Sequence, residues 1–272
     1  MTKYRASFKD SIIRIFLELK SLVRYIFLIK KENEFNIPTE YKLMFNDNFN
    51  DKEWSLKWKD ASEWWNQPYH QGYLKQWYDP LQIIESNDGV YFYAINKSKY
   101  FPEINTTIPV AVGIIRSRES WQYGIFTFSA KLPAGTYLWP ALWLTGVYSW
   151  PPEIDLLEGY SDNTNDYHRN RNLQSNVHML SDEKEHIFAG ACSHMLSNKT
   201  TENFIKYIIW WEKDFIKLYY NGYLVRHITD KEVLYKMNEP QVIIIGTGVQ
   251  EKFGVNNISP LIVNNIEVYQ KI

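Results

Sequence analysis

The sequence contains a single cysteine, Cys192, among 272 residues. An intrachain disulfide is therefore excluded, and cysteine usage gives no information about the redox compartment. No nearby sequence pattern points to an activated thiol. We therefore expect Cys192 to be a small, buried core residue.

A strong charge of either sign is also lacking, because the formal net charge is −1. No global field attracts nucleic acid, so we predict no nucleic-acid partner. A polyanionic substrate is still possible, because a cleft can be locally basic on a protein whose net charge is near zero.

Long apolar runs are missing as well. The strongest candidate lies near the N-terminus, where Arg14, Glu18, Lys20 and Arg24 interrupt it. A transmembrane helix needs about 20 largely apolar residues, so the sequence predicts no membrane span. No signal peptide is evident, since the apolar region is broken and no small-residue cleavage site follows it. The cellular location stays open.

The same N-terminal segment has the pattern of an amphipathic helix. Its apolar residues recur at helical spacing: Ile12, Ile15, Phe16, Leu19, Leu22, Val23, Ile26 and Phe27. Residues 33–40, with Pro38, resemble a linker. We therefore predict a helix and linker over residues 1–40 and one large domain over 41–272. Two interpretations of the helix stay open: it packs on the domain or on a partner, or its basic polar face lies on a membrane surface.

Aromatic residues and short strands dominate the remainder. Aromatics make up 17% of the chain, including 11 Trp and 20 Tyr, and such rings serve both as core and as stacking surfaces for sugars. Strand patterns cover residues 125–132, 207–211, 215–220, 241–245 and 261–269, and Asn221-Gly222 forms a tight turn. Few helical patterns occur, and no βαβ alternation is visible. The sequence predicts an all-β sandwich of antiparallel sheets.

Three acids lie within one apolar strand, at Glu153, Asp155 and Glu158. Side chains of a strand alternate between its faces, so Glu153 and Asp155 share a face and Glu158 would lie on the other. One extra residue at Leu156-Leu157 corrects the phase. A β-bulge has this effect, and bulges often re-aim side chains beside active sites. We predict a bulge there, with all three acids facing a cleft.

That arrangement suits the hydrolysis of glycosidic bonds. A retaining enzyme uses one ionised carboxyl group as nucleophile and a second, protonated one as general acid. Neighbouring like charges hold a proton within such a group, and Asp155 can hydrogen-bond Glu153. The carboxyl groups suffice for this chemistry, so we predict no required cofactor. Alternatives for the acids alone are a solvent-exposed acidic strand or a calcium site.

The motif Glu153-Ile154-Asp155-Leu156-Leu157-Glu158, with the preceding Trp139-Pro140-Ala141-Leu142-Trp143, resembles the family 16 glycoside hydrolases. Weaker similarities cover residues 45–49, 123–133, 207–222 and 263–270. The resemblance implies a concanavalin A-like β-jelly roll over residues 41–272, which would be the catalytic domain. It also implies Glu153 as nucleophile, Asp155 as assisting acid and Glu158 as acid/base.

The implied activity is endo-hydrolysis of a β-linked polysaccharide with net retention. The acid spacing is similar to that of laminarinases and agarases, which favours β-1,3-glucan or a galactan. Two alternatives on the same fold are a lectin-like binding module and a transglycosylase. Members of the family are usually secreted or periplasmic, whereas this sequence shows no clear signal peptide.

Two positions depart from the family pattern. Asn264 stands where the family often has an Asp that helps bind a structural calcium, and a neutral amide ligates calcium more weakly, so calcium is doubtful. Residues 243–248 lack the Asn commonly found there, so we expect one contact to the sugar acceptor to be missing.

Further residues are candidates for substrate contact. The resemblance implies sugar platforms at Trp139, Trp143 and Trp150, with core packing as the alternative for Trp143 and Trp150. His178 matches a position of a cleft histidine, with a structural role as the alternative. The last two candidates, for outer subsites, are Trp121 and Arg116, and a surface ion pair is the alternative for Arg116.

Overall fold

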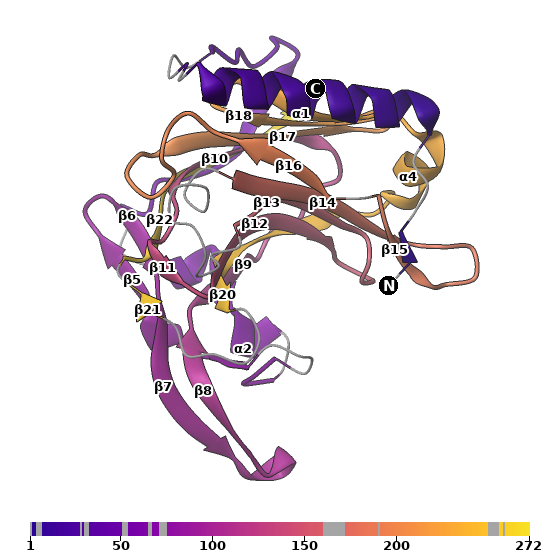
Figure 1. The fold of residues 1–272 in the computed structure, drawn as a ribbon. Coiled ribbons are helices and arrows are strands. Elements are labelled where there is room, and N and C mark those ends of the chain that lie inside the picture. The colour runs from indigo at the N-terminus through magenta and orange to yellow at the C-terminus, as the bar shows by residue number, and fades with distance from the viewer. Residues whose placement is uncertain are drawn as a thin grey trace.

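The protein is a sandwich of two large β-sheets (Figure 1). The computed structural model describes residues 2–3, 7–27, 29, 33–50, 54–64, 67–70, 75–159, 172–189, 191–249, 256–257 and 259–272. The predicted antiparallel jelly-roll sandwich is confirmed. Among the described strand pairs of the two large sheets, the short β1–β15 pair is parallel.

The first sheet, here called the cleft sheet, carries the acidic motif. Its strands follow in the order β1 (Thr2–Lys3), β15 (His186–Phe188), β14 (Asn172–Leu180), β13 (Glu153–Glu158), β12 (Leu138–Gly146), β20 (Gln241–Val249), β9 (Ile114–Ser117) and β3 (Trp58–Asp60), with β16 (Cys192–Met195) paired to β14.

The second sheet, here called the back sheet, packs against one face of the cleft sheet. Its order is β19 (Tyr223–Ile228), β18 (Phe215–Tyr220), β17 (Ile205–Glu212), β10 (Gly124–Lys131), β22 (Leu261–Lys271), β6 (Gly89–Phe92) and β5 (Ile83–Ser86), with β2 (Tyr41–Asp47) paired to β22. The turn between β18 and β19 holds Asn221 and Gly222 at φ 48° and 73°, as the Asn-Gly pair predicts.

Smaller elements surround the sandwich. A hairpin of β7 (Ala94–Phe101) and β8 (Thr106–Val112), with β4 (Gln76–Tyr78) alongside, extends away from it (Figure 1). The remaining described elements are β11 (Gly135–Thr136), β21 (Asn256–Asn257), α1 (Phe8–Ile26), α2 (Ala61–Trp64), α4 (Lys231–Lys236) and three short 3₁₀ turns at Trp54–Leu56, Pro80–Gln82 and Pro102–Ile104.

The main core lies between the two sheets. On β10, Phe126 and Phe128 are fully buried, and they share one cluster with Leu142 and Leu144 of the facing sheet. Full burial of each such side chain contributes about 1.5–3 kcal/mol. Cys192 is buried, as the sequence predicts. The core therefore fixes which face of each cleft-sheet strand points outward.

The predicted N-terminal helix forms α1, and it packs along β16 and β19, which are edges of the two sheets. Its polar side makes the contact. Glu18 Oε1 accepts a hydrogen bond from Ser193 N at 3.1 Å, and Ser21 Oγ accepts one from Met195 N at 3.2 Å. These bonds satisfy backbone donors that an edge strand would otherwise leave open. Among the described residues, no helix is both long and apolar enough to cross a bilayer.

The segment predicted as a linker is also packed. Asn33 bonds the β18–β19 turn through its backbone N–H to Asn221 O at 3.0 Å and through Nδ2 to Gly222 O at 3.2 Å. Phe35 contacts the rings of Trp210 and Tyr219 on the outer face of the back sheet. Residues 33–37 therefore lie against the sandwich.

Candidate active site

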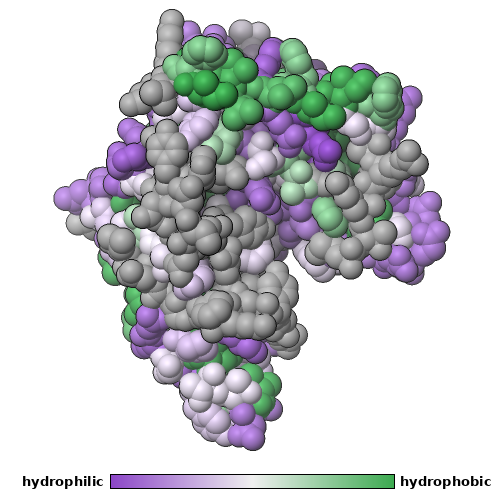
Figure 2. Space-filling view, viewed as in Figure 1, coloured by the Kyte–Doolittle hydropathy of each residue, from purple (hydrophilic) through white to green (hydrophobic). Residues whose placement is uncertain are grey.

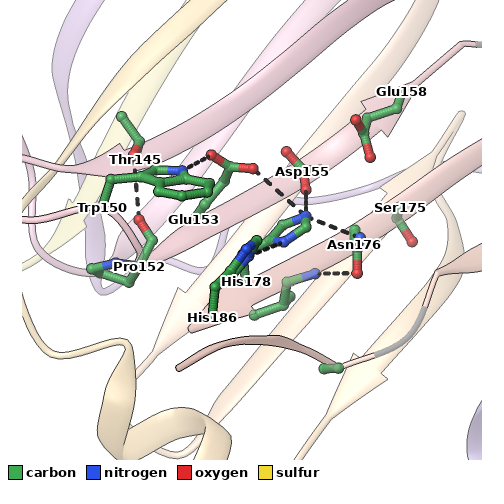
Figure 3. A network of polar contacts seen from close by, with 12 residues as sticks. Thr145, Trp150, Pro152, Glu153, Asp155, Glu158, Ser175, Asn176, His178 and His186 are labelled. Atoms are coloured by element: carbon green, nitrogen blue, oxygen red, sulfur yellow. Dashed lines mark hydrogen bonds and ion pairs between the residues drawn. The ribbon is translucent and has the colours of Figure 1, made fainter. Parts of the chain in front are cut away.

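The acidic motif forms β13, and its central bulge is confirmed by the strand register. Asp155 pairs with Asn176 and Glu158 with Gln174, so Leu156 and Leu157 lie opposite a single residue of β14. Both leucines are fully buried in the core. Two consecutive inward side chains shift the phase of the strand, and Glu158 therefore shares the outer face with Glu153 and Asp155 (Figure 3).

The bulge is held from behind by the back sheet. The hydroxyl group of Tyr220 on β18 donates a hydrogen bond to the carbonyl oxygen of Leu156 at 2.7 Å. Both groups are buried, so this bond satisfies a carbonyl that the bulge removes from the regular ladder. The geometry of the acids is thereby coupled to a residue of the opposite sheet.

Each of the two glutamates receives a hydrogen bond from an indole. Trp150 Nε1 donates to Glu153 Oε2 at 2.6 Å, and Trp139 Nε1 donates to Glu158 Oε1 at 3.1 Å. Donation of an N–H to an ionised carboxylate favours its charged form. The two tryptophans therefore contact the acids directly and line the cleft at the same time.

Burial and mutual repulsion dominate the electrostatics of the acids. Burial, followed by the charge of Asp155, raises the pKa of Glu153 well above its ordinary value, while His178 and the Trp150 bond act in the opposite direction. Burial, followed by the charge of Glu158, raises the pKa of Asp155, against the hydrogen bond to Glu153 and the charge of Arg226. The cluster thus retains a proton at pH values where isolated carboxyl groups are ionised.

His178 on β14 lies directly opposite Glu153 and faces the acids. Its Nε2 lies 3.2 Å from Asp155 Oδ2, 3.7 Å from Glu153 Oε1 and 3.0 Å from Asn176 Nδ2. Its Nδ1 lies 2.8 Å from Nε2 of His186 on β15 (Figure 3). Both nitrogens of His178 are engaged, so its ring has one fixed orientation beside the acids.

Arg226 is a buried cation between the sheets. It projects from β19, and its Nη1 donates to the carbonyl oxygen of Ser175 at 2.7 Å, while Nη2 donates to Ala189 O at 3.3 Å. Its charge favours the ionised form of Asp155. Arg226 therefore offsets part of the negative charge of the motif from beneath the sheet.

The acids form the floor of a cleft of about 680 Å³. Trp139, Trp143 and Trp150 line it, together with Arg116, as predicted from the sequence. Further lining residues were not predicted: Gln67, Tyr69, His70, Gln76, Tyr78 and Tyr148. Most come from the segment around β4, which approaches the cleft through its pairing with β8. Only that long-range pairing places them there, and the sequence around them has no distinctive pattern.

Comparison with known proteins identifies the family. The family model of the glycosyl hydrolases family 16 matches residues 84–249, which is more than half of the chain. The chain belongs to glycosyl hydrolases family 16. The matched range contains the acidic strand, both neighbouring strands and His178.

Two curated relatives are identical to this chain at about a quarter of the aligned residues. Glucan endo-1,3-beta-glucosidase A1 of Niallia circulans is 27% identical over 211 residues, covering 70% of this chain and 30% of its own length. The beta-glucanase of Rhodothermus marinus is 26% identical over 180 residues, covering 58% and 60%. The chain thus spans 30% of the length of the first relative and 60% of the length of the second.

Solved structures show the same fold. SCLam, described as a non-specific endo-beta-1,3(4)-glucanase from family 16, superposes with a TM-score of 0.70 at 20% identity, covering 89% of this chain and 95% of its own. The laminarinase catalytic domain of Thermotoga maritima gives 0.68 at 19% identity, covering 85% and 99%. Both likenesses support the jelly-roll architecture of family 16.

One predicted site residue lies elsewhere. The prediction that Trp121 serves an outer subsite is wrong, because its side chain is only 5% exposed and belongs to the main core. Its ring packs against Phe45 at 5.2 Å and Phe126 at 6.2 Å between centroids. A backbone bridge to Gln241 holds it in that position. Burial of a large ring in the core outweighs its use as a sugar platform here.

Residues 243–248, where this chain lacks the Asn that the family commonly has, lie on β20. Gly246 and Gly248 line the cleft there and carry no side chain. Next to them, Gln76 of β4 projects its carboxamide, whose Oε1 accepts a hydrogen bond from Val249 N at 2.9 Å. A polar group from a different strand therefore occupies this part of the cleft.

Two places in the chain bear on metal binding. Within the described residues, ligand atoms of Glu153, Asp155 and His178 lie within 4.8 Å of one another and have the composition of a transition-metal site. The calcium position of the family does not fit well, because Asn264 offers only a neutral amide and no group of three acidic or His ligands accompanies it in the described chain.

Proposed function

We propose that the protein is a retaining endo-glycoside hydrolase that cleaves a β-linked polysaccharide by double displacement. One observation carries the proposal: the bulge of β13 brings Glu153, Asp155 and Glu158 to the floor of one cleft whose walls bear tryptophans. A retaining mechanism needs two carboxyl groups that reach one anomeric carbon. Indole rings provide flat apolar surfaces for the faces of sugar rings.

In the first displacement, a carboxylate oxygen of Glu153 attacks the anomeric carbon. Glu158 gives its proton to the glycosidic oxygen, the bond between carbon and that oxygen breaks, and a glycosyl ester of Glu153 forms. In the second displacement, Glu158 takes a proton from water, and the water oxygen attacks the same carbon. Glu153 leaves as a carboxylate, and the product keeps the β configuration after two inversions.

Asp155 and His178 are proposed to assist Glu153. Asp155 lies beside Glu153 on the same strand face, and in its protonated form it is proposed to donate a hydrogen bond that stabilises Glu153 both as attacking and as departing carboxylate. His178 Nε2 lies 3.2 Å from Asp155 Oδ2 and 3.7 Å from Glu153 Oε1, so its ring packs against both carboxyl groups. Asp155 and His178 are therefore proposed to adjust the basicity of Glu153.

For the substrate, we propose a β-1,3-glucan, with a galactan as the less favoured choice. The names of the curated relatives, a glucan endo-1,3-beta-glucosidase and a beta-glucanase, support the glucan. Trp139, Trp143 and Trp150 are the proposed stacking platforms, and Arg116 is a proposed polar contact in the cleft. His178, predicted as a further substrate contact, lies against Asp155 and is not among the cleft-lining residues. Residues 41–272 are proposed to be the catalytic unit, with residues 1–40 as an attached segment.

The test is hydrolysis of a polysaccharide panel followed by reducing-end assay and product sizing. Laminarin, lichenan, agarose, porphyran, carrageenan and xyloglucan cover the relevant linkages. We expect cleavage of laminarin, with the β anomer appearing first by proton NMR. Binding of a glycan without any cleavage would favour a lectin-like module, and chain lengthening would favour a transglycosylase.

Active-site variants assign the two glutamates. Glu153→Gln should lower kcat by at least about 10⁴-fold, and Glu158→Gln by about 10²–10⁴-fold, whereas the exposed Glu103→Gln should leave it unchanged. Added azide separates the roles. With Glu158→Ala, azide should intercept the glycosyl ester and give the β-glycosyl azide, whereas with Glu153→Ala it should replace the nucleophile and give the α-azide. Full activity of either glutamine variant would reject the assignment.

A further inference from the structure

Helix α1 exposes its apolar side to solvent. Nine apolar side chains between its first turn and its C-terminal end are 42–82% exposed: Phe8, Ile12, Ile15, Phe16, Leu19, Leu22, Val23, Ile26 and Phe27. Figure 2 shows them as a continuous hydrophobic band along the helix. A surface helix normally buries such a stripe against its own domain. Contiguous exposed apolar patches of this size mark interaction surfaces.

The orientation of α1 is fixed by polar contacts on the opposite side. Asp10 Oδ2 accepts hydrogen bonds from Thr229 N at 2.9 Å and Asp230 N at 2.8 Å, and its Oδ1 accepts one from Thr229 Oγ1 at 2.8 Å. Glu18 and Ser21 bond the edge of β16. Rotation of the helix to bury its apolar stripe would break all of these bonds. The stripe is therefore held outward.

The charge of this segment has the opposite sign to that of the rest of the chain. Residues 1–32 contain eight Lys and Arg against three Asp and Glu, a net charge of +5, which leaves −6 for residues 33–272. The two acids of α1, Asp10 and Glu18, bond the domain. Lys9 and Lys20 are exposed beside the stripe. The outward surface of α1 is thus apolar with a basic margin.

We propose that α1 is a docking surface for an anionic lipid bilayer and lies in the plane of the membrane interface. A helix with an apolar face and exposed lysines beside it matches the chemistry of such an interface, where lysines meet lipid phosphates while apolar side chains enter the acyl boundary. The 19 residues of α1 span about 28 Å, long enough for an in-plane contact.

A second copy of the chain fits this surface less well. A two-fold interface places the same patch on both sides, so each partner would bring exposed lysines and an apolar stripe. Within α1, all of whose residues are described, no acid projects from the stripe to pair with those lysines. Anionic headgroups supply the missing negative charge. Lipid contact through α1 also leaves the cleft accessible, since none of its lining residues belongs to α1.

Vesicle co-sedimentation of the full chain tests the proposal. Vesicles of equimolar phosphatidylglycerol and phosphatidylcholine should sediment the protein, and vesicles of phosphatidylcholine alone should bind it at least about tenfold more weakly. Ile15→Gln/Leu19→Gln should weaken binding to the anionic vesicles about tenfold or more. Lys9→Gln/Lys20→Gln should weaken it about fivefold per lysine and reduce its dependence on salt.

Matched variants and a second measurement keep the outcome clear. Leu81→Gln/Ile84→Gln changes two exposed apolar residues outside α1 and should bind vesicles like the parent chain. Hydrolysis of soluble polysaccharide should be equal in all variants, since none touches the cleft. Failure of the full chain to bind anionic vesicles overturns the proposal. So does a dimer in light scattering that Ile15→Gln/Leu19→Gln converts to monomer without any vesicle binding.

Discussion

His178 and His186 face each other through their ring nitrogens, with Nδ1 of His178 2.8 Å from Nε2 of His186. His186 also packs against the indole of Trp150, with ring centroids 4.7 Å apart. Burial and the neighbouring His178 lower the pKa of His186. This contact joins the histidine beside the acids to the tryptophan above them.

Replacement of His186 should therefore affect catalysis although it is not placed against the substrate. His186→Phe keeps a ring beside Trp150 and removes the bond to His178, so kcat should fall about fivefold while KM changes little. His186→Gln, which retains a hydrogen-bonding group, should recover part of the loss. Steady-state kinetics on laminarin provides the measurement. An unchanged kcat in His186→Phe would show that His178 needs no support.

Trp139 can be tested as a hydrogen-bond donor to Glu158 separately from its proposed role as a sugar platform. Trp139→Phe keeps an aromatic face and loses the N–H that bonds Glu158. Without that donor the charged form of Glu158 is less favoured, so the limb of the pH–activity profile that reports Glu158 should move to higher pH. Trp143→Phe is the matched control, since Trp143 lines the cleft on the same strand. Equal pH profiles for both variants would contradict the prediction.

The raised pKa values of Glu153 and Asp155 predict the acidic limb of activity. Glu153, the proposed nucleophile, must be ionised to attack, and its pKa lies well above the ordinary carboxyl value because of burial and Asp155. Activity should therefore be present above this raised pKa and be lost as the pH falls through it, at a higher pH than an isolated carboxyl group would give. The profile of kcat/KM against pH checks this. Full activity persisting down to pH 4 would disprove it.

The same shift predicts that the site lowers stability. A carboxyl group whose pKa is raised in the folded state binds more protons there than in the unfolded state, so its stabilising contribution is lost as pH rises through the folded pKa. Asp155→Asn should therefore raise the free energy of unfolding at pH 7 by about 1 kcal/mol. The gain should vanish near pH 4. Urea unfolding at both pH values measures it, with the exposed Asp214→Asn as control.

Local patterns were sufficient to predict which residues of two cleft-sheet strands, β12 and β13, face outward. The period-two alternation of β12 places Trp139 and Trp143 outward, and the spacing of the acids on β13 requires the bulge that the register confirms. These features depend on residues close together in sequence. The family resemblance, given by the same residues, was also confirmed.

Features that depend on distant residues could not be predicted in this way. Tyr220 bonds the acidic strand from the back sheet, and the charge of Arg226 acts on Asp155 from the same side. Gln76 reaches the cleft through the pairing of β4 with β8. The orientation of α1 also follows from its partners, since amphipathic periodicity identifies an apolar face without saying which face the domain binds. Trp121 shows the same limit, because its neighbours Phe45 and Phe126 decide its burial.

Through the hydroxyl of Tyr220, which bonds the bulge of β13, the back sheet influences where the acids lie. Loops at the rim of the cleft can vary with the sugar that is recognised, and the spacing of the reacting groups stays constant because the interior sets it. Alteration of that spacing has to begin inside the protein. A designer who wants an enzyme with a wider gap between the two glutamates should repack β18 before changing any residue that a substrate touches.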